Sequence, residues 1–367
     1  MGGNRTNQFI GSLEGARGLA AVAVVIIHSL IQFPVDGNAA VYKETIWTLN
    51  GGSPAAMRLL MLVFNGNAGV SLFFVLSGFV LALSTQRDQR AFPTMAGSFV
   101  VRRFLRIYPP MAASVLITAG WMWLISLYWA ELNVPSAQMI WSNLLLTEFG
   151  VNGPTWTLNV ELTIVPILLL AAVASRWWGR VGVTVLLLLA LVAWARQTSP
   201  MFQQATWSAL LATYGFAFLL GSLVAELSAA PNRLSPRLAE ALALCAVISM
   251  LGARFILGFD SRMSVLVEAC SSAILVAVLA FGPPTKLRVA LNHKTARFLG
   301  RISYSVYLLH TAVLLLLIPV FRHLEWNPIA SAVMMAICAV ALVIPLGWLG
   351  YIGLERPALH LARQMAG

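Results

Sequence analysis

Apolar runs of about membrane-spanning length recur along almost the whole chain, and they constrain its fold more than any other feature. A helix needs about 20 mostly apolar residues to cross the hydrocarbon core of a bilayer. Ten such segments can be recognised, at 13–33, 68–84, 109–129, 158–174, 180–196, 207–228, 238–258, 263–281, 302–321 and 328–353. The sequence therefore predicts an all-α fold, a polytopic membrane helical bundle of about ten transmembrane helices, with a single integral-membrane domain over residues 1–367.

The composition supports this fold and excludes others. Hydrophobic residues make up 59% of the chain and charged residues 10%, and the mean hydropathy of +0.81 is far above that of soluble globular proteins. The runs are continuous rather than alternating, which excludes a β-barrel. Cys245, Cys270 and Cys338 lie inside apolar runs without the spacing of metal ligands or of a disulfide framework. We therefore expect them to be packing residues and expect no metal site.

The net charge of +11 follows a topological pattern. Membrane proteins concentrate arginine and lysine in short cytoplasmic segments. If the N-terminus is cytoplasmic, the outer segments hold only six of the 24 basic residues, namely Lys43, Arg58, Arg196, Arg254, Arg262 and Arg322. We therefore expect both termini to be cytoplasmic. The positive charge needs no nucleic-acid partner to explain it, and the lipid bilayer is the expected partner of the apolar surface.

His28 lies deep inside the first apolar run, and Glu14 and Arg17 lie near the start of that run. Arg17 and His28 are eleven residues apart, so they share one helix face at a separation of about 16 Å along the axis. Glu14 is one turn from Arg17 and can pair with it. Ionisable residues inside a membrane usually have a function. His28 is therefore a candidate general base, and a packing role with a hydrogen bond is the alternative.

Glu161 is a second ionisable residue inside an apolar run. Counted from Trp156 at the expected outer surface, it lies about 7 Å deep, and His28 lies about 8 Å from the same surface. A carboxylate beside an imidazole fixes its tautomer and stabilises its protonated form. We therefore expect Glu161 to orient His28. The alternative is that Glu161 pairs with another polar group of the bundle.

Three arginines precede the third predicted span, at Arg102, Arg103 and Arg106. Arg102 and Arg106 are four residues apart and share a helix face. Such a pair can hold phosphates, for example those of CoA, through forked hydrogen bonds. The alternative is a topology signal combined with contacts to lipid headgroups.

Several motifs, taken in order, resemble those of the acyltransferase-3 family of integral-membrane acyltransferases. They are LEGARGLAAVAVVIIH with Arg17 and His28, GNAGVSLFFVLSGFVLA at 66–82, RRFLRIYPP at 102–110, WTLNVEL at 156–162, SYSVYLLH at 303–310 and LERP at 354–357. The resemblance covers about residues 12–357. It departs from the family at Glu14, where the family usually has aspartate, but the carboxylate is kept.

The resemblance implies transfer of an acyl group, commonly acetyl, from cytoplasmic acyl-CoA to a hydroxyl of an envelope carbohydrate, glycolipid or secondary metabolite. Acyl-CoA, expected to be acetyl-CoA, would be the donor substrate, and no permanently bound cofactor is expected. A bacterial inner membrane is the expected location. The residues assigned are His28 and Glu161 for catalysis, Arg17, Arg102, Arg103 and Arg106 for acyl-CoA binding, and Glu14, Trp156, Ser303, Tyr304 and His310 for support or substrate contact.

In the mechanism that follows from these assignments, His28 removes the proton of the acceptor hydroxyl as it attacks the thioester. A two-step route through an acyl-histidine intermediate is equally open. The alternative function is that of a transporter or flippase for a lipid-linked saccharide, which buried charges and the large outer loops at 34–67 and 130–157 would suit. No inverted repeat in the sequence supports it.

Overall fold

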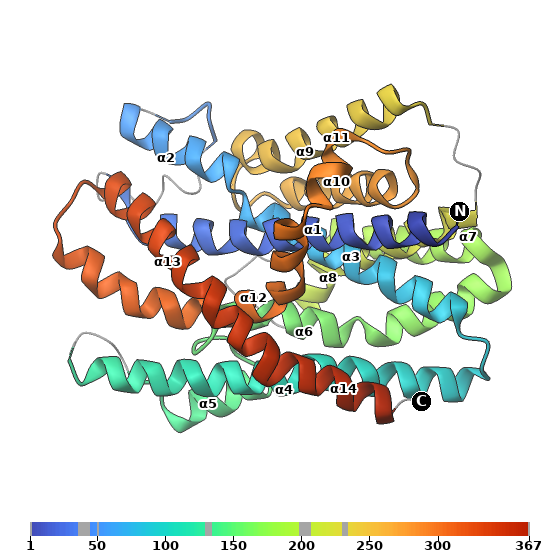
Figure 1. Cartoon of the computed structure of the whole chain (residues 1–367), viewed down its shortest axis with the longest axis horizontal. Coiled ribbons are helices and arrows are strands. Elements are labelled where there is room, and N and C mark those ends of the chain that lie inside the picture. The colour runs from blue at the N-terminus through green and yellow to red at the C-terminus, as the bar shows by residue number, and fades with distance from the viewer. Residues whose placement is uncertain are drawn as a thin grey trace.

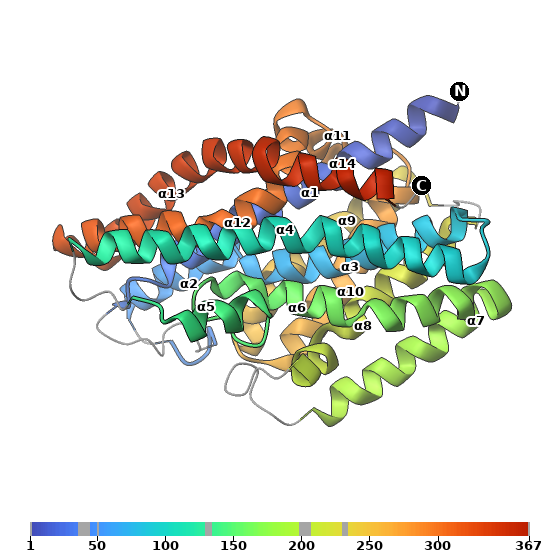
Figure 2. The same cartoon turned by 90° about the horizontal axis from the view of Figure 1, so that it is seen from below.

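The computed structural model describes residues 2–35, 45–49, 51–128, 134–197, 207–229 and 234–365, with side chains from residue 11 onward. All regular secondary structure within these ranges is helical. The long helices lie side by side along the longest axis of the molecule (Figures 1 and 2). The beginning of α1 and the end of α14 lie at the same end of this bundle, which we call the termini end.

The described part of the chain contains fourteen α-helices. They are α1 Gly2–Leu30, α2 Gly52–Val63, α3 Gly66–Arg87, α4 Phe92–Ser126, α5 Ala137–Leu144, α6 Trp156–Thr163, α7 Val165–Arg196, α8 Trp207–Glu226, α9 Pro236–Leu257, α10 Arg262–Phe281, α11 Lys286–Leu291, α12 Lys294–His323, α13 Pro328–Gly350 and α14 Arg356–Met365. Short 3₁₀ turns lie at Gly153–Thr155 and Leu227–Ala229, and the π-helical turn η5, Tyr351–Glu355, joins α13 to α14.

Nine helical stretches in the described part of the chain are long and apolar enough to cross a membrane, which confirms the polytopic helical bundle. The tenth predicted span is one arm of a hairpin. The stretch Gly153–Arg196 is one of the nine, but it contains two predicted spans. Between them, Gly179 (φ 56°, ψ −140°) turns the chain back on itself (Figure 2). A Cβ at Gly182 would lie 2.7 Å from the carbonyl oxygen of Ala174, so the two arms touch next to the turn.

The predicted start of the third span at residue 109 is wrong, because α4 begins at Phe92 and continues through Pro109 and Pro110 to Ser126. Proline in a helix interior removes a backbone hydrogen bond and usually bends or ends the helix. Here α4 also contacts the neighbouring helix, since the Tyr304 hydroxyl of α12 donates to the Ile107 carbonyl at 2.8 Å. The arginines at 102–106 therefore lie inside a long helix and not in a surface loop.

The segment before α6 enters the bundle instead of lying at its surface. Asn152 is fully buried, and its side-chain nitrogen donates to the carbonyl of Leu308, in the middle of α12, at 3.0 Å. The Tyr307 hydroxyl donates to the Pro154 carbonyl at 3.1 Å. Trp156 therefore begins α6 midway along α12, and it does not mark the outer surface that the sequence suggested.

Two helix pairs approach each other closely through glycine. A Cβ at Gly300 of α12 would lie 2.0 Å from the Glu14 carbonyl oxygen of α1, and one at Gly78 of α3 would lie 1.9 Å from the Phe218 carbonyl oxygen of α8. Small residues allow such backbone contact between membrane helices. The contact between α1 and α12 bears on the candidate site, because these helices carry His28 and His310.

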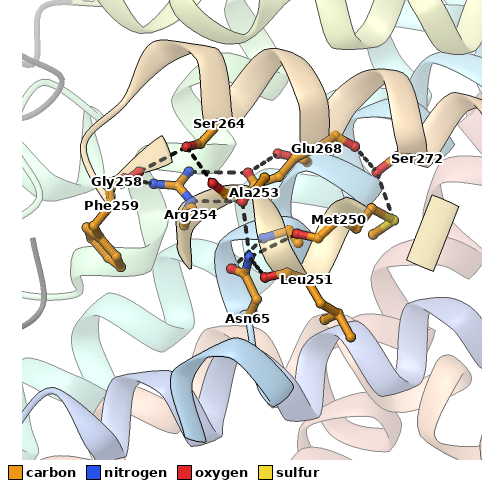
Figure 3. A network of polar contacts seen from close by, with 12 residues as sticks. Asn65, Met250, Leu251, Ala253, Arg254, Gly258, Phe259, Ser264, Glu268 and Ser272 are labelled. Atoms are coloured by element: carbon orange, nitrogen blue, oxygen red, sulfur yellow. Dashed lines mark hydrogen bonds and ion pairs between the residues drawn. The ribbon is translucent and has the colours of Figure 1, made fainter. Parts of the chain in front are cut away.

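A buried polar network joins the start of α3 to α9 and α10 (Figure 3). Arg254 and Glu268 form an ion pair with a nitrogen–oxygen distance of 2.9 Å, and their side chains are 5% and 0% exposed. The Asn65 amide, which caps α3, donates to the same carboxylate at 3.2 Å, and the Ser71 hydroxyl donates to it at 3.1 Å. Because every partner is buried, this network holds three helices in one arrangement.

Candidate active site

A cavity of about 520 Å³ lies between α1, α3, α4, α6 and α12. Its lining on α3 extends from Val70 to Arg87, which corresponds to about 26 Å of helix. The α3 side is largely apolar and includes Phe73, Phe74 and Phe79. Arg87 is the last residue of α3, which ends near the termini end of the bundle (Figure 1). The cavity is therefore long, with one apolar wall.

The opposite wall of the cavity is rich in arginine. Arg17 of α1 and Arg103 and Arg106 of α4 line it, and Arg87 adds a fourth guanidinium from the end of α3. Guanidinium groups bind phosphates and carboxylates through paired hydrogen bonds, and several of them around one space attract an anion. The cavity is therefore suited to an anionic ligand.

Three carboxylates balance part of this positive charge. Glu14 and Glu161 line the cavity, and Glu355, only 4% exposed, lies behind it. Glu355 accepts a hydrogen bond from the Ser305 hydroxyl at 3.1 Å and interacts electrostatically with Arg17 and Arg106. Its position comes from the π-helical turn η5, a rare element that is often found at functional sites.

Glu161 does not form the expected contact with His28. Its carboxylate lies 2.9 Å from the Arg103 guanidinium, which also donates to the Ser77 hydroxyl at 3.1 Å. The depth estimate was wrong because it counted from Trp156 as a surface residue, whereas the preceding segment enters the bundle. The structure instead agrees with the alternative considered from the sequence, in which Glu161 pairs with another polar group. A role for Glu161 in the chemistry stays a prediction.

Arg102 points away from the cavity, so it does not form the expected clamp with Arg106. Its side chain is 37% exposed, and its guanidinium lies 3.9 Å from the Asp88 carboxylate, just beyond the end of α3. Hydrogen bonds from Arg90 to this carboxylate lower the pKa of Asp88 to about 2, so it stays ionised at neutral pH. Of the four arginines assigned to acyl-CoA binding, Arg17, Arg103 and Arg106 face the cavity, from two helices.

His28 and His310 form a pair between α1 and α12. His28 Nδ1 lies 2.8 Å from His310 Nε2, and His310 Nδ1–H donates to the Tyr307 carbonyl at 2.6 Å. His310 is 1% exposed, whereas His28 is half-buried. A sequence with two histidines 282 positions apart gives no sign of this contact.

The histidine pair lies just beyond the deep end of the cavity. Neither histidine is among the described residues that line the cavity, but Tyr307, which accepts from His310, is. Gly69 of α3 lies against Ala20 of α1 and Gly66 lies against Val24, so Val70 is level with Ala20 and His28 is about 12 Å farther along α1. On α12, His310 follows the lining residue Tyr307 by three residues, which is about one helical turn.

The other predicted site residues divide between the cavity and its surroundings. Ser303 and Tyr304 line the cavity, as does Glu14. Trp156 packs instead against Phe74 and Tyr214, with ring centroids 6.0 and 5.0 Å away. Three further residues of the site, missed from the sequence, are Tyr307, Thr157 and Glu355. All three lie within the motifs SYSVYLLH, WTLNVEL and LERP, so the motifs marked the region but not the residues.

The apolar helices and the arginine-lined cavity inside them define an integral membrane protein with an interior binding site. An acyltransferase-domain family model, that of the acyltransferase-3 family, matches residues 10–351. The chain belongs to this family and is an acyl-transferring enzyme.

Two relatives are similar over very different lengths. The sequence is 27% identical over 391 aligned positions to acyltransferase MdmB of Streptomyces mycarofaciens, covering 95% of this chain and 92% of that one. It is 32% identical over 146 residues to nodulation protein 10 of Rhizobium leguminosarum bv. viciae, covering 34% of this chain and 38% of that protein. No solved structure matches the chain.

Proposed function

We propose that this enzyme transfers an acyl group, expected to be acetyl, from acyl-CoA to a hydroxyl group of an envelope carbohydrate, glycolipid or secondary metabolite. The observation that carries the proposal is the arginine-lined cavity, which runs along α3 and reaches Tyr307, about one turn before His310, the partner of His28. CoA presents anionic phosphates, then a narrow arm, then the thioester. Guanidinium groups, an apolar channel and an imidazole follow one another in the same order.

We place the termini end in the cytoplasm of a bacterial inner membrane. Three features support this orientation: both chain ends lie there, most arginines and lysines belong to segments at that side, and Arg87 at the end of α3 lines the cavity (Figure 1). Both relatives come from bacteria. Acyl-CoA would then enter from the compartment in which it is made.

In the binding step, Arg17, Arg103 and Arg106 hold the CoA phosphates. Arg103 is already fixed by Glu161, so the position of its guanidinium is set before the ligand binds. Arg17 and His28 lie about 16 Å apart along α1, a distance that the CoA arm must cross. The acyl group then reaches the deep end of the cavity, where Phe73 packs edge-on against Tyr307 at a centroid distance of 5.9 Å. For the acyl group to pass this contact, one of the two rings has to move. We expect it to be Phe73, because the hydrogen bond from the Tyr307 hydroxyl to the Pro154 carbonyl holds Tyr307 in place.

In the chemical step, the acceptor hydroxyl gives its proton to His28 while its oxygen bonds to the thioester carbonyl carbon. The carbon–sulfur bond then breaks, and the thiolate of CoA leaves and takes this proton from His28, which becomes neutral again. General-base removal of the hydroxyl proton makes the oxygen a stronger nucleophile. The acceptor approaches from the side of His28 that is opposite the cavity, so that donor and acceptor meet at the imidazole.

Changing Arg106 to alanine is expected to raise the KM for acyl-CoA roughly 10- to 150-fold, because a hydrogen bond to a charged group contributes about 1.5–3 kcal/mol. The kcat should change much less, since the phosphates bind equally in the ground and transition states. The measurement is steady-state transfer from radiolabelled acetyl-CoA by the purified protein in lipid nanodiscs.

The matched control is Arg102→Ala, four residues away on the same helix but outside the cavity. It removes the same charge and should leave the KM within about two-fold of wild type. Equal effects of the two substitutions would mean that the arginines act only through topology or lipid contacts, and the phosphate-binding assignment would be wrong.

A further inference from the structure

We propose that His310 is a positioning residue that sets the tautomer of His28 and leaves His28 Nε2 as the free basic atom. The chain of contacts is short: the Tyr307 carbonyl, then His310, then His28. The proposal rests on the proposed function, because the tautomer of His28 matters for the reaction only if His28 is the base. The contact between the two rings does not depend on that function.

The first proton is assigned by the Tyr307 carbonyl. A carbonyl oxygen can only accept, so His310 Nδ1, 2.6 Å from it, must carry a hydrogen. A neutral imidazole with its proton on Nδ1 has a lone pair on Nε2. A second proton would place a charge on a ring that is 1% exposed inside an apolar bundle, which is costly. His310 Nε2 is therefore an acceptor.

The second proton follows from the first. His28 Nδ1 lies 2.8 Å from His310 Nε2, and two lone pairs cannot approach so closely, so His28 Nδ1 carries the hydrogen and donates it. The rings are inclined by only 4°, and their centroids are 5.0 Å apart. This separation is close to the largest that a 2.8 Å contact between these nitrogens allows. The rings therefore meet edge to edge, with the N–H of one aimed at the lone pair of the other.

With its proton on Nδ1, neutral His28 has its lone pair on Nε2. No hydrogen bond to this nitrogen is found within the described ranges, and the His28 side chain is half-buried, so Nε2 is available to a hydroxyl group. In other proteins the Nδ1–H of a functional histidine is often held by a backbone carbonyl or a carboxylate. Here the imidazole of His310 accepts from the Nδ1–H of His28, and the Tyr307 carbonyl orients the His310 ring in turn.

This arrangement also accommodates the charge that the reaction creates. When Nε2 of His28 takes the hydroxyl proton, Nδ1–H still donates to His310, so the imidazolium keeps its partner. The close backbone contact between α1 and α12 fixes the distance between the two rings, because glycine at position 300 lets the helices touch. The pair is therefore oriented before any substrate binds.

The direct test is nitrogen-15 NMR of the full-length protein in lipid, labelled at its five histidines. Spectra of His28→Ala and His310→Ala assign the two sites by difference. Both histidines are expected to be neutral with the proton on Nδ1, whereas free imidazole side chains in water favour Nε2. A proton on Nε2 of His28 in the wild-type protein would overturn the proposal, whatever the activity.

Substitution of His310 gives a second, independent test. His310→Ala should shift His28 toward the Nε2–H form and lower kcat roughly 10- to 100-fold, as loss of an orienting partner of a functional histidine does elsewhere. The KM for acyl-CoA should be unchanged, because the arginines are untouched. His310→Gln can place its amide oxygen near the former Nε2 and should restore most of kcat and the Nδ1–H form.

The outcomes separate this proposal from the proposed function. If alanine and glutamine at position 310 lower kcat equally and leave the tautomer of His28 unchanged, His310 has only a packing role and the inference is wrong. If the tautomer behaves as expected but His28→Ala retains activity, the positioning is correct and the assignment of His28 as the base fails.

Discussion

His28→Ala is expected to lower the rate of acyl transfer about 10²–10⁴-fold, the usual effect of losing a general base. The binding of CoA should remain close to wild type, because His28 lies beyond the cavity and we propose that Arg17, Arg103 and Arg106 hold the phosphates. The two effects are measured on the same preparation, by transfer from radiolabelled acetyl-CoA and by equilibrium binding of labelled CoA. A loss of rate with retained binding identifies His28 as a participant in the chemistry.

The control for this substitution is His360→Ala, which removes an exposed histidine on α14. It should leave both the rate and CoA binding unchanged. If His28→Ala transfers acyl groups within a few-fold of wild type, His28 is not the base. If it loses rate and CoA binding together, the substitution has disturbed the cavity, and the rate then says nothing specific about the imidazole.

Glu268→Ala is expected to lower the free energy of unfolding by about 3–5 kcal/mol, because it leaves the buried guanidinium of Arg254 without its partner. The Asn65 amide, which Figure 3 shows beside Glu268, loses an acceptor at the same time, and so does the Ser71 hydroxyl. Thermal unfolding of the purified protein, followed by the fluorescence of its 12 tryptophans, measures the loss as a lower Tm. This is the largest stability effect that we expect from one substitution in the described residues.

Two comparisons make this result specific. Glu148→Ala removes an exposed carboxylate and should change the free energy of unfolding by no more than about 0.5 kcal/mol. The double change Arg254→Met with Glu268→Leu removes both charges and should be less destabilising than Glu268→Ala alone. A double variant that is no more stable than Glu268→Ala would mean that lost hydrogen bonds, and not a stranded charge, dominate the effect.

The sequence predicted much of the fold, because the physical signal for a membrane helix is local. Twenty apolar residues in a row have to lie in lipid, and ten such runs were enough to recognise a polytopic bundle. Errors arose where the chain departs from straight crossings. The clearest example is α4, which extends through Pro109 and Pro110 to include the arginines before them, whereas the turn at Gly179 falls between the spans predicted at 158–174 and 180–196.

For the site, residue type and helical periodicity indicated candidates but not their partners. Arg17, Arg103 and Arg106 were correctly expected to be near one another, and the structure places all three in one cavity. The rule that ionisable groups inside a membrane are functional or paired also applies to Arg254 and Glu268, and it could have predicted that each of them has a partner. It could not have indicated that they pair with each other.

The sequence by itself determined that this chain is a helical membrane protein of the acyltransferase-3 family, with an arginine and a histidine on one face of its first helix. Only the tertiary structure decided which groups meet. Asn152 donates to α12 and holds the segment before α6 inside the bundle, which brings Glu161 to Arg103. The close contact of α1 with α12 brings His28 to His310. Helical periodicity sets the direction of each side chain, but the depth and partner of a side chain depend on how helices far apart in sequence pack together.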